Sequence, residues 1–473
     1  MKYSSLIPAL ISVGMLYSWP SAPLLAQSGL NTKVAFLADI HLQDVYGDFQ
    51  SPEFKGVFNP KTGKYATIRT MESQLNSTRL FNENYFALKE ALEDLREKGI
   101  KLVALPGDFT DDGQPMNVIA LRKILDEYAS TYGMRFFITT GNHDPVSPFG
   151  GPASKSDFLG EKGQKQAIAS SKAILPNGQS KPVSSQISNW GYYEICRELK
   201  DFGFSPGPED LFWTHPFQEW NYEGYSFDQA LKTSAIQERI YLEKESGRML
   251  PDASYLVEPV VGIWLLAIDG NVYSSSEESD SRDSTTWAGS AIGFNLASKA
   301  KTHQLAWIKK ISHEAEKRGK VLISFSHYPL VDFHDGTSDE MKKLFGAGKF
   351  QLSRVPNTEV SELYADAGIR VHFAGHMHIN DTGILRKGNS NDLINIQVPS
   401  LAAFPPAYKI MNLENHQSMK VNTHVLNNVR GFDEFFDLYK MEYQWLIDQG
   451  SAKNWNLQIL DSEDYLNFTK IHL

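Results

Sequence analysis

Short apolar runs alternate with longer amphipathic stretches along this 473-residue chain. The run from Lys33 to Ala38 is typical of a buried strand, and residues 79–98 carry apolar side chains at helical spacing with charges between them. Gly99 is placed to end that helix. By the same reading, the expected strands are residues 33–38, 101–105, 134–140, 260–268, 320–325, 369–373, 393–398, 407–413 and 419–426. The expected helices are residues 79–98, 116–131, 299–318 and 432–449.

Residues 33–140 repeat the order strand, helix, strand, helix, strand, which predicts parallel βαβ units and an α/β fold. Ligands gather at the carboxyl ends of the strands in such sheets, so we expect the polar residues that follow these strands to converge. The pattern stops at residues 145–258, which are rich in Gly, Pro, Ser and aromatic residues. We interpret this segment as a large insertion or cap, and residues 427–473 as a C-terminal extension.

The N-terminal residues predict export. A positive start at Met1-Lys2 precedes an apolar run from Leu6 to Leu16 that is too short to span a bilayer, and small residues lead to a cleavage point after Ala26. We therefore expect a signal peptide at residues 1–26 and a periplasmic or secreted protein. A buried N-terminal helix is the alternative. The rest of the sequence predicts no transmembrane segment.

The net charge and the cysteine content of the chain argue against certain ligands and certain kinds of site. The formal net charge is −10, from 46 basic and 56 acidic side chains, which argues against a dedicated nucleic-acid surface. A small phosphorylated substrate stays open, because metal ions can supply positive charge locally. The single cysteine, Cys196, excludes a disulfide within the chain and a Cys-based zinc site. The sequence does not fix the oligomeric state.

Five short clusters of oxygen and imidazole donors follow apolar runs. They are Asp39-Ile-His41, Gly107-Asp108, Gly141-Asn-His-Asp144, Ser326-His327 and Gly375-His-Met-His378. Each cluster alone is a weak signal, since Gly-Asp is a common turn dipeptide and a lone histidine is more often structural. Their shared position after predicted strands indicates one site, and their donors suit a borderline transition metal.

In this order the clusters resemble the calcineurin-like metallophosphoesterase family, whose pattern is D-x-H, G-D, G-N-H-[D/E], a lone His and G-H-x-H. The resemblance covers about residues 33–400 outside the insertion, so a domain is expected at residues 33–426. It implies an α/β (α+β) sandwich of two mixed β-sheets flanked by helices. It also implies that Asp39, His41 and His378 hold one metal ion, that Asn142, His327 and His376 hold a second, and that Asp108 bridges them. His143 would face the substrate, and Asp144 would orient His143.

The resemblance implies a hydrolase of phosphate esters, with monoesters and diesters both open. Two divalent or trivalent ions about 3.5–4 Å apart share a water, lower its pKa and clamp the phosphate. His143 is the candidate general acid for the leaving oxygen. The nitrogen and oxygen ligands suit Fe, Mn or Zn.

Two other functions are weighed against this one. A non-catalytic binding protein of the same fold has no need for His143 and Asp144, and a metallo-β-lactamase type needs an H-x-H-x-D-H run that the sequence lacks. Asp269 is interpreted as a cleft or capping residue, and Tyr328 as a packed aromatic. Asn380 and Asp381 are candidates for supporting the ligands.

Overall fold

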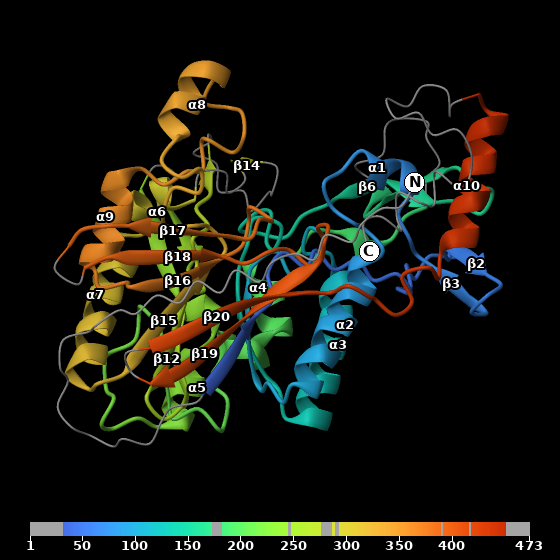
Figure 1. Cartoon of the computed structure of the whole chain (residues 1–473). Coiled ribbons are helices and arrows are strands. Elements are labelled where there is room, and N and C mark those ends of the chain that lie inside the picture. Colours follow the sequence, from blue (N-terminus) through green and yellow to red (C-terminus); the bar gives the residue numbers. More distant parts are fainter. Residues whose placement is uncertain are drawn as a thin grey trace, which may run out of the picture.

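The computed structural model describes residues 32–172, 182–244, 247–275, 286–288, 293–388, 391–415 and 418–450, so the expected signal peptide lies outside the described residues. Two mixed β-sheets form the centre of the molecule (Figure 1). The five-stranded sheet has the order β20 (Ser418–Val425), β19 (Ala407–Asn415), β1 (Thr32–Phe36), β4 (Leu102–Pro106) and β5 (Arg135–Thr139). The seven-stranded sheet has the order β17 (Asp381–Leu385), β18 (Leu393–Gln397), β16 (Val371–Ala374), β15 (Val321–Ser326), β12 (Ile263–Ile268), β11 (Tyr255–Val260) and β8 (Phe212–Thr214).

The two sheets pack against each other through apolar side chains. The Phe36 ring of β1 stacks on the Phe373 ring of β16 with centroids 3.6 Å apart, and it meets the Phe325 ring of β15 edge-on. Strands β4, β5, β15 and β16 are almost wholly buried, which explains why each has a continuous apolar run rather than an alternating pattern. Burial of this interface removes a large apolar area from water and fixes the two sheets face to face.

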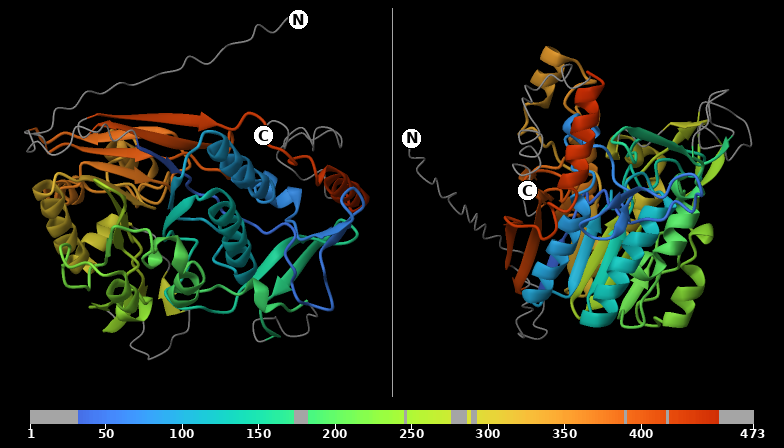
Figure 2. Two further views of the ribbon diagram at one scale, coloured as in Figure 1. Left: turned by 90° about the horizontal axis from the view of Figure 1, so that it is seen from below. Right: turned by 90° about the vertical axis from the view of Figure 1, so that its right-hand side faces the viewer.

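Helices cover the outer sides of both sheets (Figures 1 and 2). The helices α2 (Asn84–Glu97) and α3 (Pro115–Tyr132) lie on one side of the molecule, and α6 (Phe294–Ala300), α7 (Thr302–Lys317) and α9 (Thr358–Asp366) lie on the other. In α7, Ile308 and Ile311 pack into one apolar cluster with Trp264 and Leu266 of β12. The predicted sandwich of two mixed sheets flanked by helices is therefore confirmed.

Two predicted helices differ from the observed ones for local reasons. The helix expected at 79–98 begins only at Asn84, because the Leu80 N–H donates to the Ala402 carbonyl (2.7 Å) instead of joining a helix. The helix expected at 299–318 is two helices. They are separated at Lys301, which has non-helical backbone angles (φ −107°, ψ 49°) and a buried side chain.

The segment expected as one insertion contributes in part to the central fold. Strand β8 and most of β11 lie within residues 145–258, and they pair with each other at the edge of the seven-stranded sheet. The remainder forms small elements outside the sheets. These are the hairpin β6 (Ser154–Leu159) and β7 (Lys165–Ala169), α4 (Tyr192–Glu198), α5 (Phe227–Thr233), the hairpin β9 (Ile240–Glu243) and β10 (Arg248–Pro251), and helical turns at Ser185–Ile187, Lys200–Phe204 and Ile236–Glu238.

The C-terminal helix α10 (Phe436–Asp448) returns to the N-terminal part of the chain (Figure 1). The Glu442 carboxylate accepts hydrogen bonds from the backbone N–H groups of Met71 (2.8 Å) and Glu72 (2.9 Å), at the start of α1 (Met71–Leu75). The remaining elements are β2 (Val57–Asn59), β3 (Lys64–Ala66), β13 (Ser274–Ser275), β14 (Trp287–Ala288) and α8 (Ser338–Phe345). None of the helices in the described ranges combines the length and apolar character that a bilayer span requires.

Candidate metal centre

The five predicted clusters all follow parallel strands, and they meet at the carboxyl ends of both sheets. Strands β1, β4 and β5 lead into the clusters of the five-stranded sheet, and β15 and β16 lead into those of the seven-stranded sheet. The chain turns sharply at each end. The non-glycine residues there with a left-handed backbone are Asp39 (φ 50°), His41 (φ 46°), Asp108 (φ 48°), His376 (φ 72°) and His378 (φ 56°).

Glycines beside the candidate ligands let backbone and carboxylate approach closely. A Cβ on Gly141 would lie 2.2 Å from Asp108 Oδ1, and one on Gly375 would lie 2.5 Å from Asp39 Oδ2. Both positions therefore require glycine for steric reasons.

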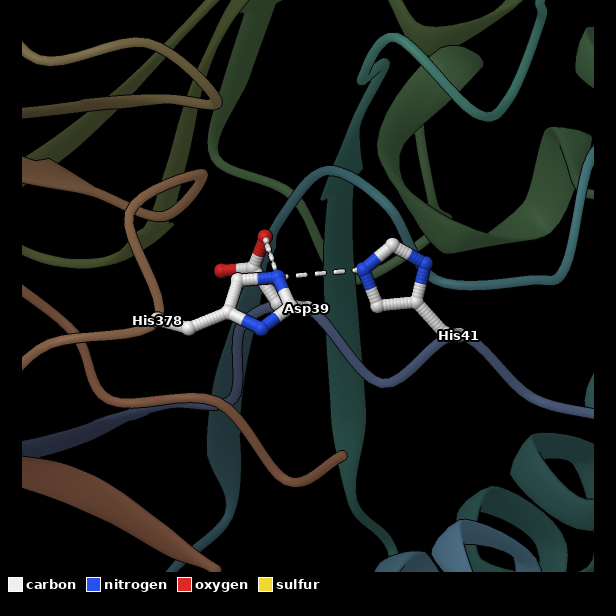
Figure 3. A group of neighbouring side chains, drawn as sticks. All are labelled: Asp39, His41 and His378. Carbon is white, nitrogen blue, oxygen red and sulfur yellow. Dashed lines mark hydrogen bonds and ion pairs between the residues drawn. The ribbon is translucent and has the colours of Figure 1, made fainter. Parts of the chain in front are cut away.

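The first group of donors is Asp39, His41 and His378 (Figure 3). The Nε2 atoms of His41 and His378 lie 3.2 Å apart, and His378 Nε2 lies 3.4 Å from Asp39 Oδ1. All three side chains point to one place, and the imidazoles present ring nitrogens to each other. Convergent lone pairs of this kind fit a bound cation.

The second group gathers around His327. Its Nε2 lies 2.9 Å from Asn142 Oδ1, 3.0 Å from His376 Nδ1 and 3.2 Å from Asp108 Oδ2. The same Asp108 oxygen lies 3.7 Å from His41 Nε2 in the first group. Asp108 therefore lies between the two groups.

The protonation states of His41, His376 and Asp108 favour metal binding, whereas burial would lower the pKa of His327 but Asp108 and Asp39 raise it. Burial, with Arg79 nearby, holds the pKa of His41 well below its usual value, and burial with His327 nearby does the same for His376. Burial alone would raise the pKa of Asp108, but the neighbouring His327 and His143 hold it well below its usual range. Neutral imidazoles and an ionised carboxylate are the forms that bind metal ions.

His143 lies beside the two groups and has different partners. Its backbone N–H donates to Asp108 Oδ1 (2.8 Å), and its ring lies 4.8 Å from the His41 ring. Its Nδ1 donates to Asp112 Oδ1 at 2.6 Å. Burial would lower the pKa of His143, but Asp108 and Asp112 raise it above the usual value. A cationic imidazole is thereby favoured.

The prediction that Asp144 orients His143 is wrong. The Asp144 carboxylate accepts from the backbone N–H groups of Thr110 (2.7 Å) and Gly141 (3.3 Å), so its hydrogen bonds close the turn, and the hydrogen bond to the His143 ring comes from another carboxylate. Burial raises the pKa of Asp144 well above the usual value. Asp112 holds the ring instead. The sequence carried a signal for it, since two further carboxylates follow Asp108 within Gly107-Asp-Phe-Thr-Asp-Asp-Gly113.

A cavity of about 600 Å3 opens over the donors. Two arginines that the sequence analysis did not single out line its wall. Arg79 Nη1 donates to His41 Nδ1 (2.8 Å), and Arg354 Nη1 donates to His376 Nε2 (2.8 Å). They lie in two loops on either side of the donor groups. A single arginine in a loop forms no sequence motif, so the sequence carried no signal for either one. Leu80, Met377 and Phe404 add apolar surface to the same cavity.

The other candidate residues lie outside the cavity wall. Asp269 is fully buried, and accepts from Thr140 Oγ1 (2.8 Å) and the Tyr192 hydroxyl (2.8 Å) behind the turn that carries Asn142. Tyr328 is buried against the His327 ring. Asn380 accepts from Lys409 at the edge of the fold. The remaining two are Asp381, which opens strand β17, and Cys196, which is buried.

The chain is similar to a protein family and to solved structures. A solved structure described as a dimetal phosphatase from Danio rerio is similar, with 12% identity over 83% of this chain and 98% of that chain and a TM-score of 0.38. No curated protein matches the sequence. The model of the family described as calcineurin-like phosphoesterase matches residues 32–238, which include the clusters at Asp39, Asp108 and Asn142. Residues 32–238 are thus similar to the calcineurin-like phosphoesterases, and the protein is a metal-dependent phosphoric ester hydrolase.

Proposed function

We propose that the protein hydrolyses phosphate esters with two metal ions held by seven side chains. One ion would be held by Asp39, His41 and His378, the other by Asn142, His327 and His376, and Asp108 would bridge them. The position of Asp108 carries this proposal. One of its carboxylate oxygens lies 3.7 Å from His41 Nε2 and 3.2 Å from His327 Nε2, so it faces both groups at once. The donor set suits Fe, Mn or Zn.

The bound ions would supply a hydroxide at neutral pH and neutralise charge on the phosphate. The leaving oxygen needs a proton, and His143 is placed to give one. Asp112 occupies its Nδ1, so Nε2 is the nitrogen left to face the substrate. The raised pKa of His143 keeps a proton available for transfer.

Two guanidinium groups on the cavity wall support binding of a doubly charged phosphate. Arg79 and Arg354 lie on either side of the donor groups, and guanidinium forks match phosphate oxygens well. Their charge favours a phosphomonoester dianion over a singly charged diester. We therefore propose that phosphomonoesters are the better substrates.

The first experiment reconstitutes the protein with Mn, Fe or Zn and measures turnover of 4-nitrophenyl phosphate and bis(4-nitrophenyl) phosphate. We expect about two metal ions per chain in the wild type, and loss of metal and activity in Asp108→Ala and Asn142→Ala. His143→Ala should retain the metal while turnover of esters with poor leaving groups falls by roughly 10²–10⁴-fold. Well-folded protein that binds none of the three metals would contradict the proposal. Bound metal with no turnover of any ester would instead favour a binding protein of the same fold.

Export is a separate proposal that rests on residues 1–26 alone. Their positive start, apolar run and small residues before the cleavage point support it. Sequencing the mature N-terminus of protein recovered outside the cytoplasm tests it directly.

A further inference from the structure

A network of mostly buried charges joins the hairpin β6–β7 to the loop that contacts His143. Lys155, on β6, places its Nζ 2.9 Å from Asp111 Oδ2 and 2.6 Å from Asp112 Oδ2. Arg69 binds Asp111 (2.8 Å) and also Asp157 of the same hairpin strand (2.6 Å). The hairpin thus brings a cation to the carboxylate that accepts a hydrogen bond from the His143 ring.

We propose that Lys155 is a positioning residue for His143, because it fixes the Asp112 carboxylate whose other oxygen holds the imidazole. The inference rests on the proposed function, in which His143 is the general acid. It adds Lys155, from a hairpin outside both central sheets, to the residues that support the reaction.

The geometry of Asp112 is the main support. Its Oδ1 accepts from His143 Nδ1 at 2.6 Å, and its Oδ2 accepts from Lys155 Nζ at 2.6 Å, so the two contacts together fix the plane of the carboxylate. Asp112 neighbours Asp111, and two adjacent carboxylates repel each other. Without Lys155, the Asp112 side chain, which is one-quarter exposed, would turn toward water and release the ring.

Other contacts hold the backbone of this loop. The effect of Lys155 on the Asp112 side chain can therefore be distinguished from an effect on the folding of the loop. Asn189 Nδ2 donates to the Asp112 carbonyl (2.7 Å), and the Trp190 N–H donates to the Gly113 carbonyl (3.0 Å). Arg69 still ties Asp111 to Asp157 when Lys155 is replaced. Loss of Lys155 should therefore free the Asp112 side chain and leave the path of the loop intact.

The same contacts argue against a third metal ion here. Asp111, Asp112 and His143 could be taken for a cation site by composition. Lys155 Nζ already lies within hydrogen-bond distance of both carboxylates, and it supplies the positive charge that a metal would bring.

The test compares Lys155→Met, Lys155→Arg and Lys165→Met in the full-length, metal-loaded protein. Lys165, on β7 of the same hairpin, pairs with Glu72 at 3.1 Å and is about half exposed, so its replacement is a matched control. Turnover is measured with 4-nitrophenyl phosphate, whose leaving group needs little protonation, and with phenyl phosphate, whose leaving group needs much more. The downfield proton of His143 Nδ1, assigned by its loss in His143→Ala, is followed by NMR.

We expect Lys155→Met to slow phenyl phosphate turnover about tenfold and 4-nitrophenyl phosphate turnover much less. The His143 Nδ1 proton should shift or broaden in this variant, Lys155→Arg should recover most of both signals, and Lys165→Met should match the wild type. If Lys155→Met does not fold, Lys155→Gln, which keeps a hydrogen-bond donor, carries the same comparison.

Equal slowing of both esters with an unchanged His143 proton would overturn the proposal and leave Lys155 a structural ion pair. Absence of any leaving-group effect in His143→Ala would instead refute the general-acid role in the proposed function. The two failures are therefore distinguishable.

Discussion

The buried ion group behind the Asn142 turn gives a stability prediction with a defined size. Lys301 Nζ donates to Asp269 Oδ2 (3.0 Å) and to the Asp269 carbonyl (2.9 Å), and it lies 4.0 Å from Asp252 Oδ2. None of these three side chains is exposed. Removal of one partner from a buried ion pair costs about 3–5 kcal/mol, because an uncompensated charge stays buried. Neutral donors such as Tyr192 still reach Asp269, so we expect Lys301→Met to cost about 3 kcal/mol.

Urea unfolding at neutral pH of the metal-free protein measures this loss. Lys299→Met is the control, because Lys299 is exposed in the preceding helix α6. The double variant Lys301→Met/Asp269→Asn should recover about 1 kcal/mol or more relative to Lys301→Met, since the second change removes the stranded charge. If Lys301→Met costs no more than Lys299→Met, the reasoning from buried charge is wrong.

Three further predictions concern the site and its surroundings. Asp112→Asn removes a charge-assisted hydrogen bond worth about 1.5–3 kcal/mol, so turnover of phenyl phosphate should fall about 10–100-fold. Asp144→Asn is the control. It should alter the unfolding midpoint and leave the ratio of phenyl phosphate to 4-nitrophenyl phosphate turnover unchanged. Gly141→Ala should displace the Asp108 carboxylate and lower metal content measured by mass spectrometry, while Gly348→Ala, where nothing lies within 4 Å, should not. Burial lowers the pKa of His372 from 6.5 to about 3. Below pH 6.5 the unfolded chain binds a proton at His372 that the folded chain does not bind. The contribution of neutral His372 to the free energy of unfolding is therefore fully present above pH 6.5 and is lost as the pH falls toward 3. Between pH 7 and pH 5 the wild type should lose about 2 kcal/mol more in urea unfolding than His372→Gln, and equal losses would contradict the assignment.

The strands and the donor clusters could be predicted because they depend on local patterns. A buried parallel strand reads as an apolar run, and the residue after it lies at the edge where ligands gather. That logic brought Asp39, Asp108 and His327 together from separate parts of the sequence, as the structure shows.

The features that sequence reasoning missed depend on contacts between distant segments. The start of α2 is set by a hydrogen bond from Leu80 to Ala402, and the break at Lys301 accompanies its buried contact with Asp269. The direction of a side chain in a tight turn also depends on contacts with distant segments. Asp144 is adjacent to His143 in sequence yet faces Thr110, while Asp112 comes from another strand end to meet the ring.

The left-handed backbone at Asp39, His41, Asp108, His376 and His378 has a consequence for how this chain tolerates change. Each such residue costs roughly 1–2 kcal/mol more than glycine in the same conformation, so the five together oppose folding by about 5–10 kcal/mol. Glycine at His41 should therefore raise the stability of the metal-free chain while removing a donor. A lineage released from selection for chemistry would gain stability by drifting to glycine at these positions. Aspartate and histidine occupy all five positions, so this chain carries the conformational cost together with five candidate metal donors.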